Sequence, residues 1–293
     1  MGTIGPIRLV VLQPTPYCNL ACSYCYLPHR DDRRRMAPDT LDAIARNVIA
    51  SPLAADEISV VWHAGEPMTL PPAWYEEAFA RLAAGGRGRR LRHAFQTNAV
   101  GVDDRWTDLW RRWDVSIGVS LDGPADLHDA TRLTRSGRGS HALAMEGIRR
   151  IREARIDVHV IAVLTRGALD DPDRMVDFFA ENGIERFCFN VEEREGANAA
   201  SSLEAAGAET AYRRFLARVA ERVAASGGGL RCREVERVRA LAAAPAEARR
   251  FNPEAEPLAI VSIAVDGRMS TFSPELLGLA SDEFDDFAFA DVH

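Results

Sequence analysis

Three cysteines, Cys18, Cys22 and Cys25, lie close together near the start of the chain. Thiolates spaced four and three residues apart on one loop can bind three irons of a cubane [4Fe–4S] cluster and leave the fourth iron without a protein ligand. That iron can then bind a substrate through nitrogen and carboxylate oxygen atoms, which a cluster with four cysteine ligands cannot do. The spacing therefore predicts a catalytic iron–sulfur cluster.

The alternative for these cysteines is a structural zinc site with His29 or His63 as the fourth ligand. Zinc sites more often combine two Cys-x-x-Cys or Cys/His half-sites, and the sequence contains no second half-site. The other two cysteines, Cys188 and Cys232, are isolated, and we interpret both as small buried hydrophobic residues. An odd number of cysteines, most of them clustered, does not favour a disulfide scaffold.

Polar residues follow several of the segments that we predict to be strands. After residues 58–62 comes a glycine turn with Gly65, Glu66 and Pro67, where the backbone can approach a ligand and Glu66 can accept a hydrogen bond from an ammonium group. An ordinary strand-to-helix turn is the alternative. Thr97 and Asn98 end another such segment, where they suit either a ligand rim or a simple turn.

A second polar run, residues 119–132, follows the fourth predicted strand. Ser120 and Asp122 can hydrogen-bond a ribose, and Arg132 can form a charge-assisted fork with a carboxylate. An arginine in a loop is usually solvated, which is the alternative for Arg132.

The elements that must position these residues alternate between two kinds. Apolar, β-branched segments alternate with segments of helical periodicity, a pattern typical of parallel βαβ units with right-handed crossovers. A closed barrel of eight units needs about 250 residues, whereas six units here end near residue 225. We therefore predict an α/β fold, a partial (β/α)6 TIM-like barrel over residues 7–225. Its strands are expected at 8–12, 58–62, 91–97, 115–121, 158–164 and 186–191.

Apolar stripes at helical spacing predict the helices between these strands. One stripe starts after Pro38 and Asp39, and another ends at Asn182 and Gly183, which are typical start and stop signals. The stripes fall within residues 41–49, 74–82, 143–151, 175–179 and 212–223.

Residues 226–293 are predicted to form a C-terminal extension. A glycine-rich linker and a helix should lead to a β-hairpin, with strands at 258–265 and 268–272 joined at Asp266 and Gly267. We expect the acidic tail, residues 281–293, to be unfinished, because it carries aromatic residues and has nothing after it to pack against.

The composition excludes some function classes. The 293 residues are 47% hydrophobic without an apolar run that could span a bilayer, so we expect a soluble protein with no membrane partner. Residues 1–6 lack a secretion pattern, which favours a cytoplasmic location. A net charge of −7, with both signs interspersed, does not favour nucleic-acid binding. The basic clusters 30–35 and 87–92 are interpreted as solvated, with binding of an acidic leader peptide as the alternative.

The cysteine spacing, with Tyr24 before the last cysteine, resembles the signature of the radical S-adenosylmethionine (SAM) superfamily. The resemblance implies a [4Fe–4S] cluster that reduces SAM to methionine and a 5′-deoxyadenosyl radical. It also implies that Tyr24 lies against the adenine and that the turn at 64–67 holds the SAM amino group. Ala64 replaces the first glycine of the family's Gly-Gly-Glu-Pro segment. Residues 120–132 resemble the SLDGP…HD…R pattern of members that act on peptides.

Four further segments resemble those of a narrower group, the maturases that form three-residue cyclophanes in ribosomally made peptides. They are residues 9–17 and 26–28, on either side of the cysteines, and residues 189–198 and 270–275. This resemblance implies a precursor peptide as substrate, a reductant such as flavodoxin or ferredoxin, and a C–C bond from an aromatic ring to a β-carbon. Closing that bond requires a proton acceptor, and we predict Glu192 or Glu193, after the sixth strand.

Such maturases usually continue into a cysteine-rich domain (SPASM type) that holds auxiliary clusters, and nothing after Cys232 could bind one. We expect the sequence to stop before that domain. The alternatives are a sulfatase-maturating or thioether-forming radical SAM enzyme, or a zinc-stabilised binding module.

Overall fold

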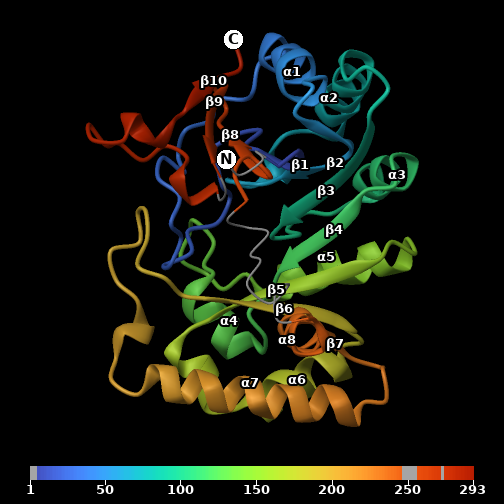
Figure 1. Cartoon of the computed structure of the whole chain (residues 1–293). Helices are drawn as coiled ribbons and strands as arrows, with labels where there is room; N and C mark the ends of the chain where they lie inside the picture. The colour runs from blue at the N-terminus through green and yellow to red at the C-terminus, as the bar shows by residue number, and fades with distance from the viewer. Residues whose placement is uncertain (1–4, 246–255, 272–273) are drawn as a thin grey trace.

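The computed structural model describes residues 5–245, 256–271 and 274–293. These residues form one ten-stranded sheet in the order β10-β9-β8-β1-β2-β3-β4-β5-β6-β7, which curves through the molecule (Figure 1). The six long strands are parallel and follow chain order, so the predicted α/β fold with a partial barrel is confirmed. Their bounds are β1 Ile7–Leu12, β2 Ala54–Trp62, β3 Arg90–Thr97, β4 Ser116–Ser120, β5 Val158–Leu164 and β6 Arg186–Val191.

Helices cover the outside of the curved sheet (Figure 1). The predicted start at Pro38 and the predicted end at Asn182 and Gly183 are confirmed. The stripe over 41–49 begins as an α-helix and continues as a π-helical turn, Ala45–Ile49. The α-helices are α1 Pro38–Ile44, α2 Pro72–Gly85, α3 Asp104–Arg112, α4 Ala125–Thr131, α5 His141–Glu153, α6 Pro172–Glu181, α7 Ala208–Ala225 and α8 Arg233–Ala243.

Helix α3 was not predicted from the sequence. Its nine residues carry five charges, which hide the short apolar stripe of Trp106, Leu109 and Trp110. The Asp103 side chain accepts a hydrogen bond from the backbone N–H of Trp106 and caps the helix. At the start of the predicted stripe over 143–151, Leu143 is 45% exposed, so Ala144 faces the core instead.

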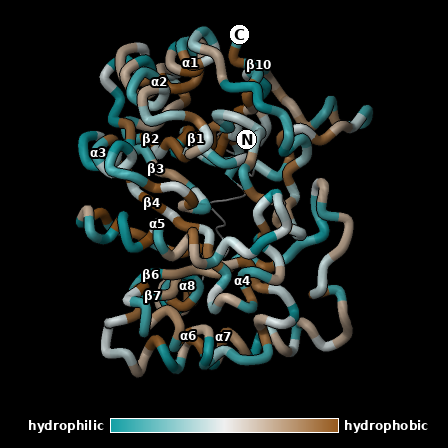
Figure 2. Tube along the Cα trace, turned by 180° about the vertical axis from the view of Figure 1, so that it is seen from behind, coloured by the Kyte–Doolittle hydropathy of each residue, from teal (hydrophilic) through white to brown (hydrophobic). Residues whose placement is uncertain are grey.

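The main core lies between the sheet and the helices. Alternate strand residues such as Val60, Trp62 and Phe95 are buried against the helices, as the period of two along a strand requires. Residues of the opposite parity face the inside of the barrel and are more polar; there Gln96 Nε2 donates to Ser120 Oγ at 2.9 Å. Figure 2 shows apolar stretches along β2, β4 and β6, whereas colours alternate along the outer helices.

The C-terminal extension lengthens the same sheet at both edges. The short strand β7 (Arg231–Cys232) pairs with β6, and β8 (Ile260–Ile263) pairs in parallel with β1. The predicted hairpin is confirmed as β8 and β9 (Arg268–Thr271), with a turn in which Gly267 has φ 97°. The expected end of its second strand at residue 272, and part of the linker, lie outside the described residues. The domain limits of 7–225 and 226–293 stay a prediction.

The end of the tail packs against the domain, whereas its aromatic residues Phe284 and Phe289 stay exposed. Strand β10 (Ala290–Asp291) pairs antiparallel with β9, and Val292 is buried. Asn47 Nδ2 donates to the carbonyl of Val292 at 2.8 Å, and Thr40 Oγ1 lies 3.2 Å from His293 Nε2. The sequence pattern did not show this contact because α1 and the π-helical turn after it supply the partner surface from a distant part of the chain.

None of the helices that the structure describes is both long and apolar enough to cross a membrane.

Candidate functional site

The cysteine loop follows β1 and is held in place through its own backbone. The Cys18 N–H donates to the carbonyl of Arg30 at 3.2 Å. Arg30 Nη1 donates to the carbonyl of Cys22 at 3.0 Å, and Arg135 Nε donates to that of Cys18 at 2.7 Å. The interpretation of residues 30–35 as merely solvated is therefore wrong for Arg30. Its guanidinium fixes the loop, because a carbonyl of a tight loop lacks a partner in regular secondary structure.

The three thiols fit an iron–sulfur cluster better than a tetrahedral zinc ion. Zinc with bonds of about 2.3 Å brings its sulfur ligands within about 4 Å of one another. Among the described residues, the ligand atoms found within 4.8 Å of one another belong to a group of three glutamates, not to the cysteines. His63 Nε2 lies 3.3 Å from Tyr26 Oη, so that nitrogen already has a partner. A cubane spreads its thiolates, since each one binds a different iron.

Burial determines the protonation of the free thiols. It raises the pKa of Cys18 to about 12 and raises that of Cys22 as well. Both are therefore neutral at pH 7 until a metal displaces their protons. The Arg132 guanidinium acts against this rise at Cys22, because it favours the thiolate. The predicted ligands Cys18, Cys22 and Cys25 thus lie on one loop with a cation beside it.

Glu66 lies at the centre of a buried hydrogen-bond network after β2. Its Oε1 accepts from the backbone N–H of Met68 at 2.9 Å and from Thr97 Oγ1 at 2.7 Å. Its Oε2 accepts from the backbone N–H of Asn98 at 2.8 Å. Burial raises the pKa of the Glu66 carboxyl, and these three donors oppose that rise. A carboxylate with about four acceptor sites keeps one for a further donor such as an ammonium group.

Thr97 and Asn98 thus position Glu66, and Asn98 also reaches the cysteine loop. Asn98 Nδ2 donates to Asn19 Oδ1 at 2.7 Å, next to Cys18. The ends of β2 and β3 and the loop after β1 therefore form one connected rim. Pro67, which begins the short 3₁₀ turn η2 (Pro67–Thr69), is buried and accepts from Tyr75 Oη through its carbonyl at 2.8 Å.

The glycine turn packs directly on the segment that leads into the cysteines. Gly65 has φ 117°, and a Cβ there would lie 2.1 Å from the carbonyl oxygen of Thr15. The Glu66 N–H donates to the carbonyl of Tyr17 at 2.8 Å. Ala64, the departure from the family's glycine, has φ 65°. An L-residue in this left-handed region is strained by about 1–2 kcal/mol.

Asp122, Arg132 and Tyr24 form a second buried group. Arg132 Nε donates to Asp122 Oδ2 at 2.9 Å, and the Tyr24 hydroxyl donates to the same oxygen. The backbone N–H of Val163 donates to Asp122 Oδ1 at 2.9 Å. Arg132 also lies 5.4 Å above the Tyr24 ring. Asp122 is therefore occupied by protein groups, while Ser120 accepts one hydrogen bond, from Gln96.

Arg132 is buried, yet the two Nη groups of its guanidinium are available to a ligand. Its side chain is 9% exposed, and neither Nη group donates a hydrogen bond to a residue that the structure describes. The loop that carries it is fixed by His128, whose Nδ1 accepts from the Asp122 N–H at 3.3 Å. Ser140 Oγ lies 2.9 Å from His128 Nε2 and donates to the carbonyl of Arg132 at 2.7 Å. The arrangement suits a ligand carboxylate.

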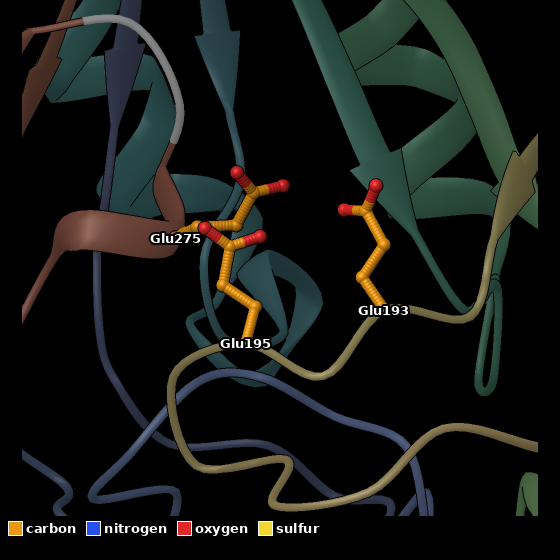
Figure 3. A group of neighbouring side chains, drawn as sticks. All are labelled: Glu193, Glu195 and Glu275. Atoms are coloured by element: carbon orange, nitrogen blue, oxygen red, sulfur yellow. The ribbon is translucent and has the colours of Figure 1, made fainter. Parts of the chain in front are cut away.

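The two glutamates predicted as proton acceptors differ in their surroundings. Glu192 Oε2 accepts from the backbone N–H of Ser202 at 2.7 Å, so it holds the start of the turn η4 (Ser202–Glu204). Glu193 instead faces Glu195 and Glu275, and the three carboxylates lie within 4.8 Å of one another (Figure 3). Burial raises the pKa of Glu195, and the neighbouring Glu275 and Glu193 add to the rise.

This acidic group lies beside the end of the cysteine loop. The Ala197 N–H donates to the carbonyl of Tyr26, the residue after Cys25, at 2.7 Å. Glu275 belongs to the 3₁₀ turn η7 (Pro274–Leu276), near which Leu277 packs in a small apolar cluster with Leu27.

Sequence reasoning missed several residues of the site. Asn19 and Arg135 act on side-chain or backbone groups of the predicted residues rather than on a ligand, and so does His128, which the resemblance pattern included without a role. Their proximity in sequence to Cys18 and Arg132 was the available signal. Glu195 and Glu275 meet across 80 positions, which no local pattern shows. Cys188 and Cys232 are buried, as predicted.

Comparisons with known proteins agree with this site. A sequence model described as the Radical SAM superfamily matches residues 12–179. The uncharacterized protein sll1766 of Synechocystis sp. is 41% identical over 294 residues, which cover 98% of this chain and 73% of that protein. The serine-type anaerobic sulfatase-maturating enzyme of Klebsiella aerogenes is 32% identical over 162 residues, or 54% of this chain and 40% of the enzyme. The chain thus spans less than half the length of this enzyme.

Two solved structures share the fold. The structure described as anSMEcpe with bound AdoMet has a TM-score of 0.81 at 16% sequence identity. The match covers 98% of this chain and 78% of the anSMEcpe chain. Streptococcus suis SuiB bound to the precursor peptide SuiA has a TM-score of 0.68 at 18% identity, covering 95% of this chain and 62% of its own.

Proposed function

Because the chain belongs to the radical SAM superfamily, we propose that it matures a ribosomally made peptide by joining an aromatic ring to the β-carbon of a nearby residue. The superfamily implies a [4Fe–4S] cluster and SAM as cofactors. Relatedness to sulfatase-maturating enzymes and the fold shared with peptide-bound SuiB support a peptide substrate. The observation that carries the proposal is the acidic group of Glu193, Glu195 and Glu275, which lies beside the cysteine loop.

The bound cofactors supply a 5′-deoxyadenosyl radical that removes a hydrogen atom from an unactivated carbon. Cys18, Cys22 and Cys25 hold the cluster. The free acceptor site of Glu66 receives the SAM ammonium, and the free fork of Arg132 receives its carboxylate. Thr97, Asn98, Gly65 and Pro67 shape and hold the Glu66 turn.

The remaining contacts divide between binding and positioning. Ser120 Oγ is placed to hydrogen-bond the ribose, and the Tyr24 ring to lie against the adenine. Asp122, whose oxygens are occupied, aligns Arg132 and Tyr24 rather than binding the ribose alone. This assignment revises the ribose contact predicted for Asp122, because four protein donors already bind its carboxylate: Tyr24, Thr131, Arg132 and the backbone N–H of Val163.

Ring closure requires both a base and an electron acceptor, because the ring radical formed by the new bond must lose one proton and one electron to become aromatic again. The electron would go to the cluster held by Cys18, Cys22 and Cys25 or to an auxiliary cluster of the SPASM type, and the proton to a nearby carboxylate. Glu193 is the better candidate of the two predicted glutamates, since Ser202 already occupies Glu192. Glu193 also lies with Glu195 and Glu275 beside the end of the cysteine loop. Glu193→Gln should slow crosslink formation by about 10²–10⁴-fold, the usual contribution of a general base, without changing SAM cleavage. Glu192→Gln is the matched control and should slow crosslinking far less.

The test of the product is co-expression of the full-length enzyme with the small peptide encoded by a neighbouring gene. Tandem mass spectrometry should show a peptide lighter by two hydrogen atoms, with fragmentation blocked across three residues, and NMR should locate a bond from ring carbon to β-carbon. An unmodified peptide would refute the proposal.

A second candidate is a sulfatase-maturating activity, favoured by the 32% and 28% identities to serine-type enzymes of Klebsiella aerogenes and Bacteroides thetaiotaomicron. A formylglycine at a serine of the substrate, without a crosslink, would identify it. A thioether would instead indicate a sulfur-to-carbon maturase.

A further inference from the structure

Six arginines gather on two segments next to the cysteine loop, and we call them the arginine patch. The segments, residues 30–35 and 135–138, contain two aspartates, so their net charge is +4 on a chain whose total is −7. An acidic protein that concentrates positive charge in one place creates a local field that attracts acidic partners. The patch consists of Arg30, Arg33, Arg34, Arg35, Arg135 and Arg138.

Tyr17 joins the two segments into one surface. Arg33 lies 4.1 Å above the Tyr17 ring and Arg135 lies 5.1 Å from it. Arg33 Nη2 also donates to Tyr17 Oη at 3.0 Å. Guanidinium groups near an aromatic ring are held by cation–π attraction, so segments more than 100 positions apart form a single patch.

The patch is bonded to the backbone of two predicted cluster ligands. Arg135 Nε donates to the carbonyl of Cys18, and Arg30 Nη1 donates to the carbonyl of Cys22, as described above. Arg135 also pairs with Asp31 and donates to the carbonyl of Arg30. The path from these arginines to the cysteine sulfurs therefore consists of one hydrogen bond and the few covalent bonds within each cysteine.

The outer arginines remain available to a partner. Arg34 pairs with Asp32 but its side chain is 63% exposed. Arg35 and Arg138 are exposed, and neither has an acidic partner in the part of the chain that the structure describes. The other basic cluster, residues 87–92, differs: Arg89 pairs with Asp56 at 3.0 Å, and Arg92 with Glu57 at 2.7 Å.

We propose that the arginine patch is the docking surface for an acidic one-electron carrier protein, which reduces the cluster from this side. The carrier loses one electron and the cluster gains it, and no covalent bond forms or breaks. Electron transfer slows steeply with distance, so a carrier seated over the backbone of Cys18 and Cys22 has a short path. The inference rests on membership of the superfamily and not on the identity of the peptide product.

The test compares two charge-reversed variants. Arg34→Glu with Arg35→Glu reverses the outer patch and leaves Arg30 and Arg135, which hold the cysteine loop, unchanged. Arg87→Glu with Arg155→Glu is the control with the same charge change. Both control residues are exposed and precede β3 and β5, so they lie at the opposite end of the parallel strands. Neither has an ion pair with a described residue.

Binding of oxidised flavodoxin to the anaerobically reconstituted enzyme is measured by calorimetry at low and high salt. At low salt, the patch variant should bind flavodoxin about tenfold more weakly than the wild type, and the affinity of the control should stay within about twofold of the wild type. The reason is that the reversed charges in the patch repel the acidic carrier as it approaches. High salt should remove the difference between wild type and patch variant. Iron content and reduction by dithionite should be equal in all three proteins, which shows intact clusters.

Three results would overturn the proposal. Equal weakening in both variants would mean that only net charge matters, and unchanged binding in both would mean that the carrier docks elsewhere. Unchanged flavodoxin binding together with weaker binding of the precursor peptide to the patch variant would assign the surface to an acidic leader peptide. A failed peptide product with weakened flavodoxin binding would refute the proposed function alone.

Discussion

The rim of the barrel is built in two different ways on its two sides. On the side of β2, β3 and β4, Glu66, Asp122 and Arg132 are buried; the two carboxylates each accept several hydrogen bonds, and Arg132 is paired with Asp122. On the side of β6 and η7, Glu193, Glu195 and Glu275 are less buried, and a carboxylate oxygen of each lies within 4.8 Å of those of the other two. On the first side, the hydrogen-bonding groups have protein partners except for one acceptor site of Glu66 and the two Nη groups of Arg132. The second side instead brings three negative charges together.

This difference follows from the energy of burying charge. An unpaired buried charge costs several kcal/mol, so the buried side must satisfy its charges within the protein. Exposed carboxylates are solvated and tolerate one another at a small cost. A rigid side suits a cofactor that has the same shape in every turnover, and a loosely held side suits a substrate or proton that comes and goes.

The largest expected effect is the loss of a cluster ligand. Replacing Cys18, Cys22 or Cys25 by Ala should reduce the iron content from about four per chain to near zero and abolish SAM cleavage. Iron and sulfide analysis after anaerobic reconstitution measures it. Cys188→Ala and Cys232→Ala are the controls, because both thiols are buried away from the loop. Loss of iron in either control would contradict the assignment of ligands.

Breaking the buried ion pair should have the next largest effect. Arg132→Met leaves Asp122 buried without its cation and should lower the free energy of unfolding by about 3–5 kcal/mol, as measured by urea denaturation. Glu193→Gln, on the loose side, should change it by less than about 0.5 kcal/mol. Equal effects would mean that the two sides of the rim do not differ.

Arg132→Lys separates the effect of the charge at this position from the effect of the guanidinium shape. It keeps a cation for Asp122 but loses the planar fork, so SAM binding should weaken by about 1.5–3 kcal/mol in anaerobic calorimetry. Stability should fall less than in Arg132→Met.

Strand β3, which leads to Thr97 and Asn98 of the buried side, also carries His93 on its helix-covered face, and this histidine makes the stability of the fold depend on pH. Burial lowers the pKa of His93 to about 4; its ring stacks on Phe79 at 4.0 Å, and its Nδ1 accepts from Trp62 Nε1 at 3.3 Å. The unfolded chain, with a pKa near 6.5, binds more protons than the folded one between pH 6.5 and 4. Stability should therefore fall by on the order of 2 kcal/mol as the pH falls through this window.

His93→Gln removes the titration and keeps an acceptor for Trp62. Urea denaturation across this pH range should show a shallower slope for the variant than for the wild type. An identical slope would place the acid sensitivity at other groups.

The smallest effect concerns the strained turn of the buried side. Ala64→Gly should raise the free energy of unfolding by about 1 kcal/mol, because glycine adopts φ 65° without strain. The gain is reduced by the greater freedom of glycine in the unfolded chain. A control, Ala154→Gly after helix α5, has a negative φ and should destabilise. A loss of stability in Ala64→Gly would show that strain there is negligible.

Much of the site could be predicted because its signals are local. The spacing of Cys18, Cys22 and Cys25 within one loop limits where their sulfurs can lie, whatever the rest of the chain does. The strands and most helices follow from periodicity, and polar residues after parallel strands must meet at one edge of the sheet. Helices α3 and α4 were missed because each is short and offers too few apolar residues to establish a helical period in the sequence.

The sequence by itself determined the kind of chemistry, the order of the strands and the edge at which the site lies. Only the tertiary structure decided which charges are satisfied. Tyr24 reaches Asp122 across 98 positions, and Arg135 reaches the carbonyl of Cys18 across 117. Such contacts depend on how far the sheet curves and on the path of each loop. These are collective results of packing that no short stretch of residues encodes, and they separate the rigid cofactor side from the open acidic side.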